Sequence, residues 1–474
     1  MILRKKRVNA TEGPIFSKMF FFVVPLMLAN LLNHLYNVAD NIVVGQFSGD
    51  PYALAAVGAT GALNSAFVQL SAGLSIGVGV VIARAFGAKD KQTLSRGVHV
   101  AMLLALIVGA ALGVIRYTLS EPILVLMGTN PEILSNAVLY TKILAVGMPG
   151  TVIYAIGAAV LRSVGDSKTP LYMVTIAGML NVILNMFFVI VCGMSVDGVA
   201  YATLISKYVS AIGVVAVLMK RRGEDYAFDP RKMCLDGKMV KEMLYIGIPS
   251  AVQSAAYSIT NLFLTAALNT FPIDVMSART VATNIDVLLS TAINTYLHAT
   301  MTFTSQNFGA KKPERMRKSI MAALIQASVI GIAVGQLMLI FYEPLVNMYL
   351  AADDPNRVAV LAYAKQIMTV MLSSYFIGAM ADSMSGFLRG MGASISSMVI
   401  SIIGICGGRC AWIFLVFPQY GTLTSLYVVY PISWTVTLIG LSTVAFFVYR
   451  RVKRKMLEER EEDVALDENA AEYV

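Results

Sequence analysis

The sequence predicts an all-α integral membrane protein with twelve transmembrane helices, divided into two homologous six-helix lobes. Of its 474 residues, 57% are hydrophobic and only 14% are charged, whereas soluble domains carry about 25% charged residues. The mean hydropathy is +0.69. This balance excludes a soluble enzyme, a disordered chain and a secreted disulfide scaffold. The apolar segments are continuous rather than alternating, which also argues against an outer-membrane barrel.

Twelve apolar runs are bounded by charges or by Pro and Gly turns, and each is long enough to cross a bilayer. The first six are expected at 16–45, 53–83, 97–117, 133–161, 170–191 and 199–219, and the second six at 241–271, 278–306, 319–342, 358–388, 395–418 and 424–449.

These runs divide the chain into five parts. We expect a cytoplasmic N-terminal segment at 1–15, a first lobe at 16–219, a basic cytoplasmic linker at 220–240, a second lobe at 241–449 and a cytoplasmic tail at 450–474.

The distribution of basic residues tests the number of spans. If the N-terminus is cytoplasmic, thirty of the 37 Lys and Arg residues fall in cytoplasmic segments and only five fall outside. One missed helix would invert this asymmetry for the rest of the chain. We therefore expect a multi-pass protein of the plasma (inner) membrane with both termini in the cytoplasm. The net charge of +9 then reflects basic loops beside the bilayer, and no nucleic-acid partner is expected.

Short matches at equivalent places reveal an internal repeat. Phe86-Gly87-Ala88-Lys89 recurs as Phe308-Gly309-Ala310-Lys311, and Glu121-Pro122 recurs as Glu343-Pro344. A repeat of six spans is a parallel repeat, because both halves enter the membrane the same way. The substrate path is expected at the interface between such halves.

Asp40 is the strongest candidate for chemistry, because ionisable groups inside spans are costly. Spacings of three and four residues place four polar side chains on one helix face: Asn30, Asn33, Asn37 and Asp40. Asn33 and Asn37, with Tyr36 beside them, are expected to face a substrate cavity. A carboxyl group there could couple proton flow to substrate release or ligate Na⁺. The alternative is an interfacial Asp that caps the helix end near Gly45.

Further charged residues lie within the spans. Lys207 is expected at a depth similar to that of Asp40, either as its counter-charge or as a lysine that snorkels to the interface. Asp286 and Arg409 form a second pair at similar depth, for which a structural ion pair is the favoured interpretation.

Two more groups could act near the cavity. Asp382 precedes Arg389 by seven residues, so it either gates the inner side or pairs with that arginine. Gln253, Tyr257 and Asn261 are spaced by four residues and form a polar face that suits either substrate contact or packing between helices.

Catalysis is not expected. The chain has no HExxH motif, no GxSxG in a serine-elbow context and no Walker-type GxxxxGK[ST] motif. We expect no metal centre and no cofactor other than H⁺ or Na⁺ as coupling ion. Gly73, Gly77 and Gly79 predict a close-packing helix face.

Residues 14–450 resemble the multidrug and toxic compound extrusion (MATE) family of antiporters. The segments Asp40–Gly45 (DNIVVG) and Ala53–Gly58 (ALAAVG) are similar to the family's first-span motif and the start of its second span. Gln306–Lys311 (QNFGAK) resembles the signature that closes the family's span eight, and Leu388–Gly392 (LRGMG) resembles the turn after its span ten.

The resemblance implies two six-helix lobes around a central cavity, which opens alternately to either side. A cation, H⁺ or Na⁺, moves inward while small cationic or amphipathic compounds move out. It also implies a monomer whose partners are small-molecule substrates and the lipid bilayer.

In this resemblance Asp40 matches the carboxylate implicated in cation coupling. Proton-coupled relatives often carry a second acid in span five, where this chain has Asn185. Asn181 and Asn185 could hydrogen-bond Asp40 or ligate an ion. Other relatives have acids in spans seven and ten, but span seven here has none and Asp382 lies about one turn from the usual position. The identity of the coupling ion therefore stays open.

Two other functions compete with this one. A lipid-linked saccharide or lipid flippase of the same broad fold group is the alternative, although such flippases usually keep a cationic cavity and often extra helices. A channel or receptor would not explain a two-lobe repeat.

Overall fold

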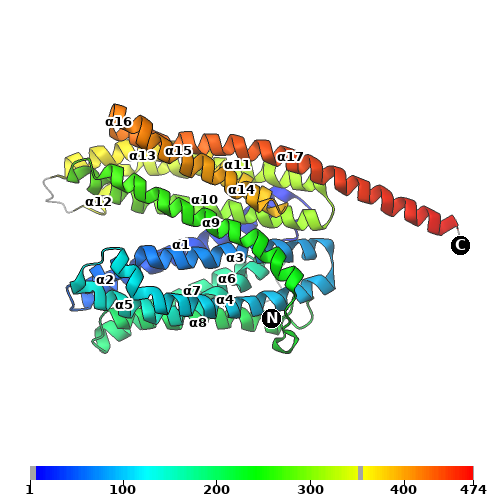
Figure 1. Ribbon diagram of the computed structural model, residues 1–474, viewed down its shortest axis with the longest axis horizontal. Helices are drawn as coiled ribbons and strands as arrows, with labels where there is room; N and C mark the ends of the chain where they lie inside the picture. The colour runs from blue at the N-terminus through cyan, green and yellow to red at the C-terminus, as the bar shows by residue number, and fades with distance from the viewer. Residues whose placement is uncertain (1–6, 351–355, 473–474) are drawn as a thin grey trace. The chain divides into compact units, whose positions relative to one another are not determined.

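The computed structural model describes residues 7–350 and 356–472, with side chains up to residue 462. The described residues form helices joined by turns and loops and contain no β-strand. They divide into two compact units (Figure 1).

Each of the first six predicted spans corresponds to a helix or to a helix pair. They are α1 (Ile15–Phe47), α2 (Ala53–Ala59) followed by α3 (Gly61–Ala88), α4 (Lys91–Leu126), α5 (Pro131–Val146) followed by α6 (Met148–Ser163), α7 (Lys168–Met186) with the π-helical η1 (Phe187–Val191), and α8 (Val196–Lys220). A short 3₁₀ turn, η2 (Pro230–Lys232), follows in the predicted linker.

The second six correspond in the same way. They are α9 (Gly237–Leu268), α10 (Ile273–Gly309), α11 (Pro313–Ile340) followed by the short α12 (Tyr342–Asn347), α13 (Arg357–Gly390), the broken series α14 (Ser394–Ser401), η3 (Ile402–Gly407), α15 (Gly408–Ala411), η4 (Trp412–Val416) and α16 (Phe417–Tyr420), and finally α17 (Leu423–Glu472).

Nine of the described helices are long and apolar enough to cross a membrane, and the α5–α6 pair, bent by 48°, gives up to 10. α9 and α10 complete the predicted twelve. They have 32 and 37 residues, which is long enough to span, but their polar side chains lower their hydropathy. The bend between α5 and α6 falls at Gly147, just before Pro149, which has no N–H to continue the helical hydrogen bonding.

The division into units does not follow the predicted linker. The first unit holds Phe21–Phe86 and Asp90–Ala255 with the described residues up to Val8, and the second holds Asn9–Phe20, Gly87–Lys89 and the described residues from Ala256 onward. The chain therefore changes unit inside α9, and residues 220–240 lie in the first unit.

Glycines of α3 explain this difference. A β-carbon on Gly73 would lie 2.6 Å from Ala251 Cβ, and one on Gly77 would overlap the carbonyl oxygen of Met243. Because these two glycines have no β-carbon, the first half of α9 packs directly on α3 in the first unit. Two of the three glycines predicted to form a close-packing face therefore do so.

The predicted tail from residue 450 continues as helix. α17 has 50 residues and extends far beyond the neighbouring helices of the second unit (Figure 1). Arg454 pairs with Glu458 and Lys455 with Glu459 one turn further on. Such pairs stabilise an exposed helix modestly.

Glycines also bring α10 and α13 together in the second unit. A β-carbon on Gly386 would overlap the carbonyl oxygen of Leu297 in α10. We expect Gly386→Ala to destabilise the protein by about 1–3 kcal/mol, the usual cost of overpacking. Gly408→Ala is the matched control, because its β-carbon would meet only Ser433 Cβ at 4.0 Å. Thermal unfolding in detergent should show a lowered midpoint for Gly386→Ala alone, and equal midpoints would contradict this packing.

Candidate functional site

Three helices of the first unit converge on Asp40. α1 supplies this carboxylate, α7 supplies Asn181 and Asn185, and α8 supplies Thr203. Asp40 is only 8% exposed, and both asparagines are buried. Asn181 and Asn185 are four residues apart, so they project from the same face of α7.

The four side chains form one hydrogen-bonded group. Asn185 Nδ2 donates to Asp40 Oδ1 and, at 3.4 Å, to Asn181 Oδ1. Thr203 Oγ1 donates to Asp40 Oδ2 at 3.5 Å. Asn181 Nδ2 donates to Thr203 Oγ1 at 3.4 Å. Both carboxylate oxygens of Asp40 thus have a neutral donor from another helix.

The group is rich in oxygen atoms and is incompletely satisfied. Asn185 Oδ1 is buried and accepts no hydrogen bond from any residue that the structure describes. Buried polar atoms normally have a partner, and a buried carboxylate is costly unless it is neutralised. A proton on Asp40 would remove its charge. A small hard cation would do so too, and carboxylate, amide and hydroxyl oxygens are ligands that such ions accept.

Lys207 is the nearby positive charge. It lies one turn after Thr203 on α8 and attracts Asp40 electrostatically. Among the described side chains, no direct ion pair joins the two. Lys207 therefore acts on Asp40 through space, and the carboxylate oxygens stay with Asn185 and Thr203.

The predicted polar face of α1 is split. Asp40 is buried, whereas Asn30, Asn33 and Asn37 are exposed. Tyr36 lies one turn before Asp40 and also packs against α7. Its hydroxyl donates to Thr175 O at 3.3 Å, and its ring occupies the space that a β-carbon on Gly178 would need. Asp40 therefore sits between a face packed on α7 and a face that carries the exposed asparagines.

In the second unit, Asp286 and Arg409 attract one another, but each has a different closest partner. Asp286 is hydrogen-bonded to the Tyr375 hydroxyl. The Arg409 guanidinium lies 4.1 Å from the centroid of the Tyr430 ring, and its Nε donates to Ser433 Oγ at 3.3 Å. No direct ion pair between Asp286 and Arg409 occurs in the described part of the chain. In place of the expected ion pair, Asp286 contacts Tyr375, and Arg409 contacts Tyr430 and Ser433.

Asp382 of α13 lies near Arg389, as one of the two predicted alternatives requires. It is attracted by that arginine and hydrogen-bonded to Asn294 of α10. Tyr257 of α9 also lies close to Arg389. These residues form a second polar group inside the second unit.

The predicted polar face of α9 crosses the division between units. Gln253 belongs to the first unit and is buried, whereas Tyr257 and the exposed Asn261 belong to the second. All three lie four residues apart on the continuous helix α9, and their contact with substrate stays a prediction.

Thr203 is the site residue that the sequence did not single out. It hydrogen-bonds both Asp40 and Asn181. Its place one turn before Lys207 was an available signal, because residues four apart share a helix face.

A polytopic helical chain with two similar halves and a buried acidic group in the first half defines a membrane transporter built from a repeat. The MatE family model matches the chain twice, over residues 25–187 and 249–409. The chain therefore belongs to the MATE family of transporters, and the double match confirms the predicted repeat.

Two relatives show how far the likeness extends. The chain is 26% identical over 452 residues to the probable multidrug resistance protein YoeA of Bacillus subtilis, covering 93% of this chain and 96% of that one. It is 26% identical over 410 residues to the probable multidrug resistance protein NorM of Thermotoga maritima, covering 84% and 86%.

A solved structure has the same fold. A crystal structure of MATE in complex with MaL6 superposes with a TM-score of 0.86 at 24% identity, covering 95% of this chain and 100% of that one. The MATE fold, predicted from the sequence, is thus confirmed. As a member of the MATE family, the protein is a membrane-embedded transport protein.

Proposed function

We propose that this protein is a cation-coupled antiporter that exports small organic compounds of cationic or amphipathic character. The observation that carries the proposal is the buried Asp40 carboxylate, held by neutral donors from α7 and α8 and left without a direct ion pair among the described residues. Asp40 is the group that takes up H⁺ or Na⁺ as the coupling ion.

The neighbouring side chains prepare Asp40 for exchange. When the coupling ion leaves, the Asn185 amide and the Thr203 hydroxyl stabilise the free carboxylate with hydrogen bonds, which are strong when the acceptor is charged. If the ion is Na⁺, the oxygens of Asn181, Asn185 and Thr203 serve as ligands beside the carboxylate. If it is H⁺, the same groups hold the protonated acid in place.

Substrate binding is assigned to the polar faces next to the coupling group. Asn33 and Asn37 are exposed beside Tyr36 on α1, and Gln253, Tyr257 and Asn261 are the candidates on α9. Asp286, Asp382 and Arg409 remain candidates for charge partners or gates in the second unit. Because Asp40 borders the exposed face of α1, a substrate cation there and the coupling cation would repel one another.

The proposed orientation follows from the basic loops. The strong excess of Lys and Arg on one side supports an orientation with both termini in the cytoplasm and the protein in the plasma membrane. Export then exchanges an outward-moving compound for an inward-moving cation.

The test uses the purified protein in liposomes, with the fluorescent cation ethidium and an imposed H⁺ or Na⁺ gradient. We expect one of the two gradients to drive ethidium accumulation, and that gradient names the ion. No movement under either gradient, together with movement of a fluorescent lipid-linked saccharide, would contradict the proposal and favour a flippase.

Lys207 should tune the affinity for the coupling ion. A positive charge that acts on Asp40 repels any cation that binds there, so we expect Lys207→Met to lower the cation concentration at half-maximal transport by about tenfold. This corresponds to about 1.4 kcal/mol, a moderate interaction in a medium of intermediate dielectric constant. Lys207→Arg keeps the charge and should resemble the wild type. An unchanged half-maximal concentration in Lys207→Met would mean that Lys207 snorkels away from the site.

A further inference from the structure

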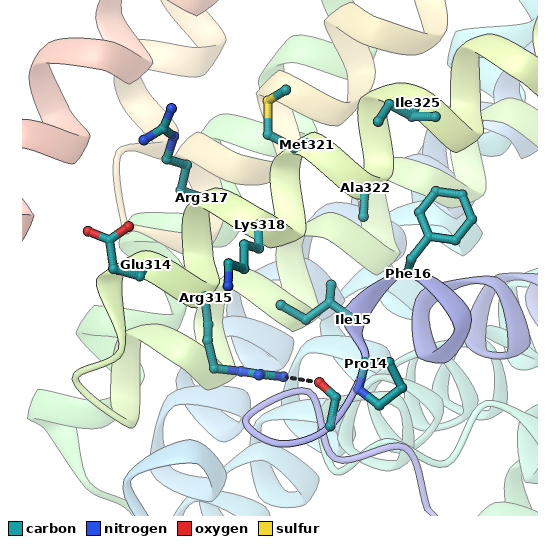
Figure 2. A pocket seen from close by; sticks show the side chains of 11 residues that line it. Pro14, Ile15, Phe16, Glu314, Arg315, Arg317, Lys318, Met321, Ala322 and Ile325 are labelled. Atoms are coloured by element: carbon teal, nitrogen blue, oxygen red, sulfur yellow. Dashed lines mark hydrogen bonds between the residues drawn. The ribbon is translucent and has the colours of Figure 1, made fainter.

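A hollow at one end of the second unit lies between the N-terminal segment and α11 (Figure 2). Its volume is about 510 Å³, which is large enough for a lipid headgroup and the first part of an acyl chain. One wall is formed by Gly13–Phe16 and the other by the first four turns of α11.

The N-terminal wall is fixed by side chains of the same unit. Arg315 Nη2 donates to the carbonyl oxygens of Ala10 and Gly13 at 3.0 and 2.9 Å. Gln326 Nε2 donates to Phe16 O at 2.6 Å. These bonds use backbone carbonyls as acceptors and hold the segment against α11, so the hollow is built by specific contacts.

The hollow carries an excess of positive charge. Its acid, Glu314, is paired with Lys453 at 2.5 Å. Arg315 is attracted electrostatically by the exposed Glu12 and forms no ion pair with a described residue. Arg317 and Lys318 are exposed, and neither forms an ion pair with any of the described residues. Two cationic side chains are therefore available to an anion.

An apolar surface continues from the basic end. Phe16, Met321 and Ile325 line the hollow with their side chains about half exposed, and Val329 is exposed one turn further along α11. Figure 2 shows Arg317 and Lys318 toward one end and Phe16 and Ile325 toward the other. From Lys318 to Ile325 the helix rises about 10 Å, so the surface turns from basic to apolar over a distance similar to that between a lipid phosphate and its upper acyl chain.

We propose that this hollow binds one anionic phospholipid. Its phosphate group contacts Arg317 and Lys318, and one acyl chain lies along Met321, Ile325 and Val329 while the other covers Phe16. Charge complementarity selects an anionic headgroup, and the apolar stripe along a membrane-spanning helix selects a lipid over a free anion. Under the proposed orientation the site faces the cytoplasmic leaflet, but binding in detergent does not depend on that orientation or on transport.

The test measures lipid binding to the purified full chain by native mass spectrometry and by the midpoint of thermal unfolding. The probes are dioleoyl-phosphatidylglycerol, dioleoyl-phosphatidylcholine and inorganic phosphate. We expect phosphatidylglycerol to bind and raise the midpoint more than phosphatidylcholine does. The double variant Arg317→Gln, Lys318→Gln should weaken phosphatidylglycerol binding by about ten- to thirtyfold, because both charges near the phosphate are lost.

The matched control is Arg454→Gln, Lys455→Gln, which removes one Arg and one Lys from the exposed part of α17. It should leave phosphatidylglycerol binding unchanged. The charge swap Arg317→Lys, Lys318→Arg should retain binding, which separates loss of charge from loss of fold. Equal weakening in the control would overturn the proposal in favour of diffuse attraction, and competition by inorganic phosphate at similar concentration would overturn it in favour of a free-anion site. Unchanged binding in the pocket variant would also overturn it.

Discussion

We expect Asp40→Asn to abolish gradient-driven substrate accumulation in liposomes. An amide keeps the size of the side chain but cannot bind and release a cation in exchange for substrate. For exchange of one proton, a gradient of one pH unit provides 1.36 kcal/mol and so supports up to about a tenfold substrate gradient. The wild type should approach this limit, or the corresponding limit for Na⁺, whereas Asp40→Asn should show no accumulation under the same gradient.

Asp274→Asn is the control for the loss of one carboxylate. Asp274 lies in the first turn of α10 in the second unit and takes no part in the hydrogen-bonded group around Asp40. Its transport should match that of the wild type. If Asp40→Asn accumulates substrate as the wild type does, Asp40 has no role in coupling.

Asn185→Leu is expected to have the second largest effect. The substitution removes the donor to Asp40 Oδ1, and hydrogen bonds to charged groups contribute about 1.5–3 kcal/mol. The free carboxylate therefore becomes about ten- to a hundredfold less favourable, and the turnover of coupled transport should fall by a similar factor. Asn185→Asp, which supplies an acid where proton-coupled relatives often carry one, should retain coupling.

The control for Asn185→Leu is Asn136→Leu. Asn136 Nδ2 also donates to a carboxylate of the first unit, Asp50 Oδ2, at 3.0 Å, but outside the Asp40 group. Reduced turnover in both variants would indicate a general loss of structure. An initial rate for Asn185→Leu equal to that of the wild type would show that the hydrogen bond to Asp40 is dispensable.

Hydropathy and charge were enough to predict the helices, because burial of backbone in lipid leaves few alternatives to a helix. The repeat predicted two halves, and the double family match confirms them. The division between compact units was not predictable in the same way. It falls inside α9, where Gly73 and Gly77 of α3 admit close packing, and such contacts depend on the register between helices.

The site shows a similar limit. The spacing of Asn181 and Asn185 and the resemblance at Asp40 named three members of the hydrogen-bonded group. Thr203 was missed because one hydroxyl among many in the apolar spans is not distinctive by itself, and its spacing of four residues from Lys207 was not used. The separation of Asp40 from the exposed Asn33 and Asn37 also depends on the packing of α1 against α7. Residue spacing defines a helix face but does not say which neighbouring helix covers it.

The most direct measurement is the exchange of cation for substrate on the purified protein without any gradient. Ethidium is added to the protein in weakly buffered detergent solution, and released protons are recorded with a pH indicator while displaced ²²Na⁺ is counted in parallel. The account predicts that the wild type releases one kind of cation on substrate binding and that Asp40→Asn binds ethidium but releases none. Equal release from both proteins, or ethidium binding to the wild type with no release of either cation, would contradict the assignment of Asp40 as the coupling group.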